Sequence, residues 1–174
     1  MKKIIGMALS IAAVSFTTVL LSGNRSSASD ANQIKNIKPA PSWELQNLDG
    51  KTVHSSDFKG KVVVLDFWAT WCPPYRAEIP GFIELQKKYQ AQGLAVVGVS
   101  VDQASSDTVK MFAQKLGINY PVVLTDTKVV TAYGGIDGLP TTFIIDRAGS
   151  IVKQHLGFTE KSEIESEIKS LLNP

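Results

Sequence analysis

The sequence predicts an α/β fold in which helices cover both faces of a central mixed β-sheet. Two runs of β-forming residues, 61–68 and 94–100, are apolar enough to be buried strands. Residues 73–92 between them have helical spacing, with Gly93 at the helix end. A right-handed crossover of this kind makes the two strands parallel. The composition, 44% hydrophobic and 20% charged, is typical of a globular chain.

Turn signals and helical spacing predict the remaining elements. In chain order these are an N-terminal hairpin across Asp49-Gly50 at 43–54, a short helical turn at 55–60, a helix capped by Ser106 and Asp107, a strand at 121–124, a helix at 128–133, a hairpin at 142–156, and a last helix with a Ser162–Glu165 capping box that ends near Leu172.

The first 28 residues form a separate region. Two lysines precede an apolar run, and small residues lead to Ala28, which together indicate a signal peptide cleaved after that residue. The alternative is an uncleaved N-terminal anchor, although the run is short for a membrane span. We expect a linker at 29–38 and one domain at 39–174. In either case the domain functions outside the cytoplasm, where disulfides persist.

Charge argues against nucleic acid as a partner. The chain has 18 basic and 16 acidic residues, and its net charge is +2. Residues 1–28 contain three of the basic residues and no acidic one, so the rest of the chain has a net charge of −1. A nearly neutral domain gives no reason to propose nucleic acid as a partner.

The single cysteine lies where an apolar strand gives way to a helix. Pro73 and Pro74 follow Cys72, and proline suits the first helical turn because a missing N–H costs nothing there. Unpaired backbone N–H groups and the helix dipole favour a thiolate at this position, which makes a cysteine reactive. A buried structural thiol is the alternative. Without a second cysteine, Cys72 either pairs with another molecule or remains a free thiol.

The residues around Cys72 resemble a known family. Trp71 to Pro80 reads Trp-Cys-Pro-Pro-x-Arg-x-Glu-x-Pro, Asp66 precedes the cysteine by six residues, and residues 138–143 read Gly-Leu-Pro-Thr-Thr-Phe. From about Pro39 onward the chain resembles the TlpA/ResA type of thioredoxin-like proteins in the AhpC/TSA–redoxin superfamily. These are exported bacterial thiol–disulfide oxidoreductases.

The resemblance implies a thioredoxin fold with an N-terminal β-hairpin and a central αβ insertion. It also implies a location in the periplasm or at the outer face of the cytoplasmic membrane. Protein thiols and disulfides would be the partners, apocytochrome c or another exported redox protein among them.

Tyr75 is a departure from the family pattern, which has Cys-x-x-Cys. The family's second cysteine attacks a mixed disulfide and releases the partner, and a phenol cannot do this. Because Tyr75 lies three residues after Cys72, both face one side of the helix. Tyr75 either shields or hydrogen-bonds the sulfur, or it fills space. Arg76 is expected on a solvated helix face, and Trp68 in the core.

The resemblance also assigns roles to four other residues. Pro140 matches the family's cis-proline, whose loop faces the active cysteine, and Leu139 then offers backbone groups to an extended substrate strand. Asp66 matches a buried acid that exchanges protons with the second cysteine, so its role here is open. Glu78 matches an acid–base group near the thiol, with a solvated helix face as the alternative. The other residues expected to bind the partner are Trp71, Pro73, Pro74 and Tyr75.

The residue pattern gives little support to two other site chemistries. His54 and His155 lie far apart on predicted strands, and with one cysteine they form no recognisable metal-ligand set. Peroxiredoxins require Pro-x-x-x-Thr-x-x-Cys, but Leu65 and Ala69 occupy the Pro and Thr positions. We therefore expect neither a metal nor a cofactor.

Three functional hypotheses remain open. The first is an exported thiol–disulfide oxidoreductase that uses Cys72 alone, with an external thiol to resolve the mixed disulfide. The second is a non-catalytic binding module that keeps the groove beside the cis-proline. The third is a Cys-to-Tyr trapping variant of an ordinary Cys-x-x-Cys enzyme.

Overall fold

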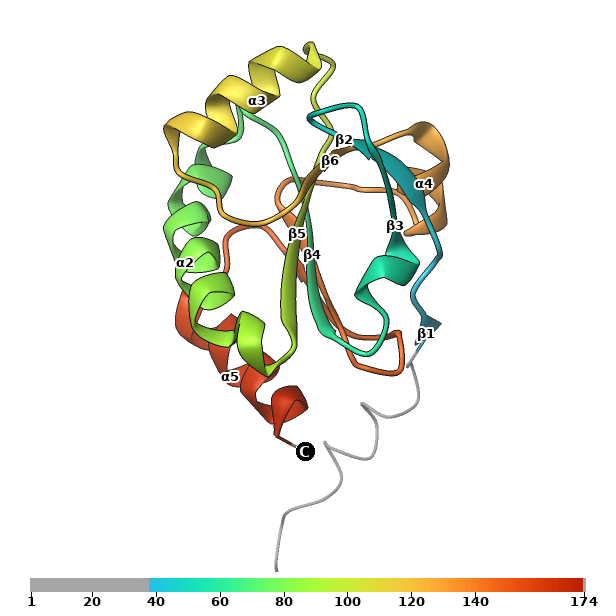
Figure 1. Ribbon diagram of the computed structural model, residues 1–174, viewed down its shortest axis with the longest axis vertical. Coiled ribbons are helices and arrows are strands. Elements are labelled where there is room, and N and C mark those ends of the chain that lie inside the picture. The colour runs from blue at the N-terminus through green and yellow to red at the C-terminus, as the bar shows by residue number, and fades with distance from the viewer. Residues whose placement is uncertain (1–37, 174) are drawn as a thin grey trace, which may run out of the picture.

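The computed structural model describes residues 38–173 (Figure 1). The predicted signal peptide or anchor, and all of the predicted linker except Lys38, lie outside the described residues. The elements are β1 (Lys38–Pro39), β2 (Glu44–Asn47), β3 (Thr52–His54), the 3₁₀ turn η2 (Ser55–Phe58), β4 (Val62–Trp68), α2 (Pro73–Tyr89), the 3₁₀ turn η3 (Gln90–Gln92), β5 (Leu94–Ser100), α3 (Ser106–Lys115), β6 (Val122–Leu124), α4 (Thr127–Ala132), β7 (Thr141–Ile145), β8 (Ser150–Leu156) and α5 (Lys161–Leu172).

The strands form one mixed sheet in the order β1-β8-β7-β4-β5-β6-β2-β3. β4, β5 and β6 run parallel, and the other neighbouring pairs are antiparallel. β4 and β5 are buried along their whole length, which explains why both are continuously apolar apart from Asp66 and Ser100. The predicted α/β thioredoxin-like fold is confirmed, including the N-terminal β2–β3 hairpin.

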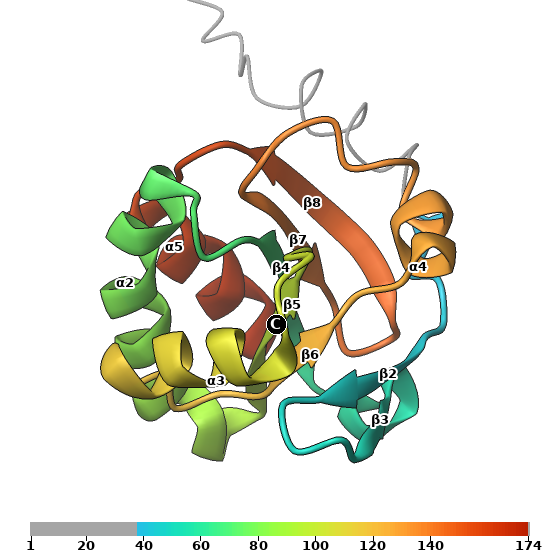
Figure 2. The ribbon, with the colours of Figure 1, turned by 90° about the horizontal axis from the view of Figure 1, so that it is seen from above.

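Helices cover both faces of the sheet (Figures 1 and 2). On one face, buried residues of α2, α3 and α5 pack against Val62, Val64 and Trp68 of β4. On the other face, Val129 of α4 and Trp43 beside the hairpin pack against the alternate residues of the same strand. The strand that ends beside the cysteine loop therefore lies between two cores.

The boundaries of α2 depend on the residues that cap it. Cys72 is the N-cap residue, and Pro73 and Pro74 occupy the first two helical positions. The regular helix ends at Tyr89 rather than near Gln92, because η3 tightens the last turn. Gly93 follows with a φ of 95°, a left-handed conformation that favours glycine.

Two predicted caps are wrong by one or two residues. Ser105, rather than Ser106 or Asp107, caps α3 and accepts a hydrogen bond from the Thr108 N–H. The N-cap of α5 is Glu160, so Ser162 lies inside the helix. Tertiary contacts explain the second difference, since Glu165 bonds to Lys88 and Tyr89 of α2 rather than to its own helix start.

The first strand of the described residues, β1, pairs with β8, with Lys38 opposite Ile151. Within the described residues, no helix has the length and apolar character needed to cross a membrane.

Candidate functional site at the start of helix α2

Cys72 lies on the short connection between β4 and α2. Its backbone N–H donates to the Ala69 carbonyl at 3.0 Å, which closes a turn directly before the helix. The side chain is only 3% exposed and belongs to the core cluster beneath α2. Trp71, by contrast, is 66% exposed. The sequence-predicted placement of the cysteine at a helix start is confirmed.

Pro140 lies beside the same end of the sheet. The Leu139–Pro140 peptide bond is cis, as the resemblance implied. The register of β4 and β7 pairs Phe67 with Thr141, so the proline immediately before Thr141 lies next to the end of β4 where the cysteine loop begins. Leu139 is half-buried and packs against both core clusters. Pro73 and Pro74 are exposed. The candidate site thus consists of the start of α2, with Cys72, and the Leu139–Pro140 loop before β7.

Asp66 and Glu78 are buried carboxyl groups in the same region. Thr142 donates its hydroxyl hydrogen to Asp66 Oδ1 at 2.9 Å, and the Thr159 N–H donates to Glu78 Oε1 at 2.7 Å. Each acid has a second oxygen that is buried without a partner, Oδ2 of Asp66 and Oε2 of Glu78. The solvated-face alternative for Glu78 is therefore wrong.

Burial determines the protonation of these two acids. Loss of solvent raises the pKa of Glu78 from 4.5 to about 7, against the opposing effect of its bond from Thr159. Burial raises the pKa of Asp66 well above its ordinary value, and the nearby charge of Glu78 adds to this, while the Thr142 bond opposes it. A pKa near neutrality is suitable for a group that both donates and accepts a proton.

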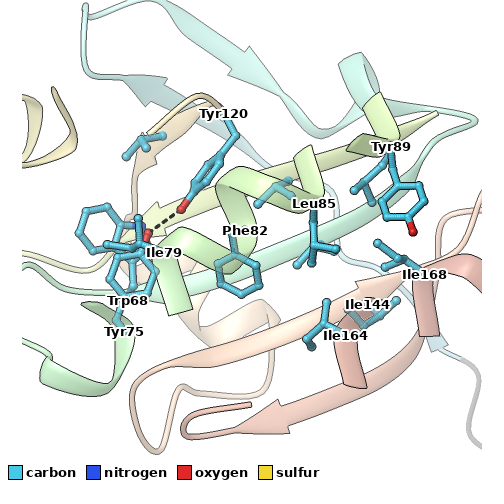
Figure 3. Packing of buried hydrophobic residues seen from close by; sticks show 14 of the residues in the cluster. Trp68, Tyr75, Ile79, Phe82, Leu85, Tyr89, Tyr120, Ile144, Ile164 and Ile168 are labelled. Carbon is cyan, nitrogen blue, oxygen red and sulfur yellow. Dashed lines mark hydrogen bonds between the residues drawn. The ribbon is translucent and has the colours of Figure 1, made fainter. Parts of the chain in front are cut away.

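Tyr75 points into the core rather than to the surface (Figure 3). Its ring stacks on Trp68, with the centroids 4.3 Å apart and the planes inclined by 16°. Its hydroxyl oxygen lies 3.1 Å from that of Tyr120, and the side chain is fully buried. The hydrogen-bonding reading, in which Tyr75 bonds the Cys72 sulfur, is wrong, because the hydroxyl pairs with Tyr120. A fully buried ring also has no surface to offer a partner in this conformation.

Trp68 is fully buried, as predicted. Its indole Nε1 has no hydrogen-bond partner, and a Cβ added to Gly98 would lie 2.7 Å from this atom. The glycine on β5 therefore makes room for the indole on which Tyr75 stacks.

Sequence reasoning missed two residues, Asp102, which holds the cysteine loop, and Tyr120, which holds Tyr75. Asp102 accepts hydrogen bonds from Thr70, two residues before Cys72. Asp102 follows the end of the parallel strand β5, and polar residues at the carboxyl ends of parallel strands commonly line a site. That signal could have identified it. Tyr120 has no comparable signal, because its pairing with Tyr75 spans 45 residues.

One group in the described part of the chain has the spacing of metal ligands, namely His155, Glu163 and Glu167. His155 Nε2 lies 2.8 Å from Glu167 Oε2, and Lys153 Nζ lies 3.9 Å from Glu167 Oε1. His155 lies on β8, and the two glutamates lie on α5. Their contacts are those of a surface ion-pair network that joins this strand to this helix.

The mixed sheet, the helix-start cysteine and the cis-proline beside it define a thioredoxin-like α/β protein. The profile of the AhpC/TSA family matches residues 37–154. The chain is 40% identical over 136 residues to the thiol-disulfide oxidoreductase ResA of Bacillus subtilis (strain 168), which covers 78% of this chain and 74% of that protein. It is 33% identical over 142 residues to ResA of Bacillus anthracis, with 82% of each chain covered. The chain belongs to the AhpC/TSA family and is similar to its ResA-type members.

Solved structures agree with this assignment. A thiol:disulfide interchange protein of the thioredoxin family from Chlorobium tepidum TLS superposes with a TM-score of 0.73 at 35% identity, covering 79% of this chain and 98% of that one. An exposed lipoprotein thioredoxin from Streptococcus pneumoniae has a TM-score of 0.66 at 35% identity, covering 75% of this chain and all of that one. The resemblance inferred from the sequence motifs is confirmed.

The raised pKa of Glu78 predicts a pH-dependent stability. Below about pH 4.5 the acid is protonated in both the folded and the unfolded chain. As the pH rises to 7, the unfolded chain releases its proton first, so the free energy of unfolding falls. Glu78→Gln keeps an acceptor for Thr159 and cannot ionise. Its stability relative to the parent should therefore increase by about 3 kcal/mol between about pH 4 and pH 8.

Chemical denaturation at several pH values measures this difference. Glu160→Gln alters an exposed carboxylate at the N-cap of α5 and should change the free energy of unfolding by less than about 1 kcal/mol at any pH. If the free energy of unfolding of Glu78→Gln depends on pH in the same way as that of the parent, then Glu78 ionises in the folded chain as easily as in the unfolded chain, and the prediction is wrong.

The Tyr75–Tyr120 pair predicts non-additive substitutions. Tyr75→Phe or Tyr120→Phe alone leaves a buried hydroxyl without its partner and should cost about 1–3 kcal/mol of unfolding free energy. The double variant removes both hydroxyls and should cost clearly less than the two single changes combined. Denaturation of all four proteins completes the double-mutant cycle. Additive costs would mean that the two hydroxyls do not interact.

Proposed function

We propose that the protein is an exported thiol–disulfide oxidoreductase that acts on protein disulfides through Cys72 alone. The observation that carries this proposal is the pairing of a helix-start cysteine with a buried tyrosine at position 75. The helix start supplies N–H groups and a dipole that favour a thiolate. The tyrosine occupies the position from which a second thiol would resolve a mixed disulfide.

The reaction proceeds by thiol–disulfide exchange. The Cys72 thiolate attacks one sulfur of a partner disulfide, forms a mixed disulfide, and releases the other partner sulfur as a thiolate. An external thiolate, such as that of glutathione, then attacks the Cys72 sulfur of the mixed disulfide, forms a new disulfide with Cys72 and releases the second partner sulfur as a thiolate. A second external thiolate attacks the external sulfur of this new disulfide, which releases the Cys72 thiolate and the oxidised external disulfide. Two electrons pass from the external thiols to the partner.

Asp66 and Glu78 would move the protons of this cycle. Glu78, with a pKa of about 7, both takes up and releases a proton near neutral pH. Asp66 is the more strongly perturbed acid, and in its protonated state it would serve as a proton reserve. In a chain without a second cysteine, these acids would assist the external thiol rather than an internal one.

Partner binding would use the surface next to Cys72. Trp71 is exposed, as are Pro73 and Pro74, and the Leu139–Pro140 loop lies beside the end of β4. We assign exported proteins with cysteine pairs as the partner class, apocytochrome c among them, on the resemblance to the ResA type. The basic and apolar start of the chain supports export.

A second candidate is a binding module without turnover. The observation that favours it is the 3% exposure of Cys72 next to a Trp71 that is 66% exposed. Such a surface would bind a partner through the indole while the thiol stays covered. The two candidates differ in whether Cys72 forms a mixed disulfide at all.

The trapping-variant hypothesis has less support. A tyrosine introduced at a cysteine position would meet a core shaped for a smaller side chain. Tyr75 instead stacks on Trp68 and pairs with Tyr120, and Gly98 leaves space beneath the indole. This packing favours a chain whose core is matched to tyrosine.

Tyr75→Cys tests the one-cysteine mechanism. The new thiol lies three residues after Cys72 and should attack a mixed disulfide within the chain, at an effective concentration that no external thiol reaches. With a dithiol reductant at low concentration, the variant should reduce insulin rapidly in catalytic amounts, whereas the parent should accumulate as a mixed disulfide and turn over at a rate that rises with the concentration of the dithiol or of added glutathione. Losing the tyrosine ring should also cost about 3–5 kcal/mol of stability.

Cys72→Ser is the control and should give no reduction and no mixed disulfide under either condition. If the parent forms no mixed disulfide with insulin while its thiol still reacts with a small alkylating reagent, the oxidoreductase proposal fails and the binding module remains. Because the expected loss of stability is large, the Tyr75→Cys assay requires a folded variant, verified by circular dichroism.

A further inference from the structure

The backbone of Thr70 is held on both sides by charged side chains, at its N–H by Asp102 and at its carbonyl by Arg76. Its N–H lies 2.9 Å from Oδ2 and 3.2 Å from Oδ1 of Asp102, and its hydroxyl donates to Oδ1 at 2.6 Å. Its carbonyl accepts from Nη2 of Arg76 at 2.8 Å and from Nε at 3.2 Å. Hydrogen bonds to charged groups are among the stronger ones in proteins. A loop residue with its donor, acceptor and hydroxyl all bonded in this way is firmly fixed.

Both charged side chains are themselves held in position. Asp102 lies on the connection between β5 and α3, and the hydroxyl of buried Ser100 donates to its Oδ2 at 2.8 Å. Arg76 lies on α2, and its guanidinium lies 5.4 Å from the centre of the Phe112 ring on α3. Phe112 stacks in turn on Trp68. The contacts of Thr70 therefore connect the cysteine loop to the sheet and to two helices.

Thr70 belongs to the turn that presents the cysteine. Within Ala69–Cys72, the Cys72 N–H donates to the Ala69 carbonyl, and Trp71 is the only residue whose side chain is largely exposed. Arg76 is exposed, as predicted. The prediction did not include the hydrogen bond that its guanidinium donates to the Thr70 carbonyl of the cysteine loop. The steps of thiol–disulfide exchange themselves require neither Arg76 nor Asp102.

We propose that Asp102 and Arg76 are positioning residues, which hold the N–H and the carbonyl of Thr70 from opposite sides and so fix Cys72 and the exposed Trp71 relative to each other. Neither residue reacts with the partner. Their effect is to remove motions of the turn before a partner arrives, so that a large partner meets the sulfur and the indole in one arrangement. A small reagent needs no such arrangement and should depend little on these contacts.

The test compares two pairs of variants of the chain. Asp102→Asn removes the charge and one acceptor, and Asp107→Asn makes the same change on neighbouring α3, where the carboxylate has no contact with Thr70. Arg76→Met removes both donors to the Thr70 carbonyl, and Arg76→Lys keeps one positive donor. The readouts are hydrogen exchange of the Thr70 and Cys72 amides by NMR, and the rates at which Cys72 reacts with iodoacetamide and with insulin.

Asp102→Asn and Arg76→Met should each speed exchange of these amides about tenfold, since loss of one charged hydrogen bond is worth about that factor. The rate with insulin should fall about tenfold, while the rate with iodoacetamide should stay equal or rise. Arg76→Lys should recover part of both losses, and Asp107→Asn should match the parent. A merely structural role would leave the ratio of the two rates unchanged.

The expected fall in the rate with insulin rests on the proposed function, because it requires that Cys72 react with protein disulfides. Amide exchange requires no thiol chemistry, so it separates failure of the inference from failure of the oxidoreductase proposal. Parent-like exchange in Asp102→Asn and Arg76→Met would overturn the inference, as would an equal loss of both rates. If Asp102→Asn does not fold, the exposed Arg76 pair provides the same comparison.

Discussion

The stack of Tyr75 on Trp68 is the contact on which the chemistry of this site depends. It fills the side of α2 where the family has its second cysteine, and the hydroxyl pair with Tyr120 satisfies the polar end of the ring. Tyr75 is therefore part of the core rather than a substitute for a thiol. Cys72, three residues earlier at the helix start, is left without an internal partner, so every disulfide that it forms must involve another molecule.

The remaining parts of the site surround this stack. Trp68 ends β4, Gly98 on β5 gives its indole room, and Phe112 on α3 covers it. The buried acids Asp66 and Glu78 lie close enough that each raises the pKa of Tyr75, after burial and Tyr120. Two carboxyl groups buried beside a hydrophobic core are expensive to maintain, because each must be protonated or paired. The cost is easier to understand if the acids serve proton transfer.

Much of this arrangement was predictable from the sequence. Continuous apolar runs identified β4 and β5, and paired prolines identified the start of α2, because these signals act over a few residues. Caps were less predictable, since Glu165 bonds to Tyr89 of α2 instead of completing the predicted capping box with Ser162. The pairing of Tyr75 with Tyr120 joins segments 45 residues apart, and no local pattern encodes it, whereas the place of Asp102 after a parallel strand marks it as a site residue without naming Thr70 as its partner.

The claim that Cys72 forms disulfides only with other molecules is tested most directly by intact mass spectrometry of the purified protein. Diamide and glutathione should convert the chain to a form with one glutathione attached at Cys72, which a reductant releases again. Oxidation without glutathione should give a disulfide-linked dimer or a sulfenic acid. A chain that remains an unmodified monomer under both conditions would contradict the account, because its thiol would then be a covered core residue.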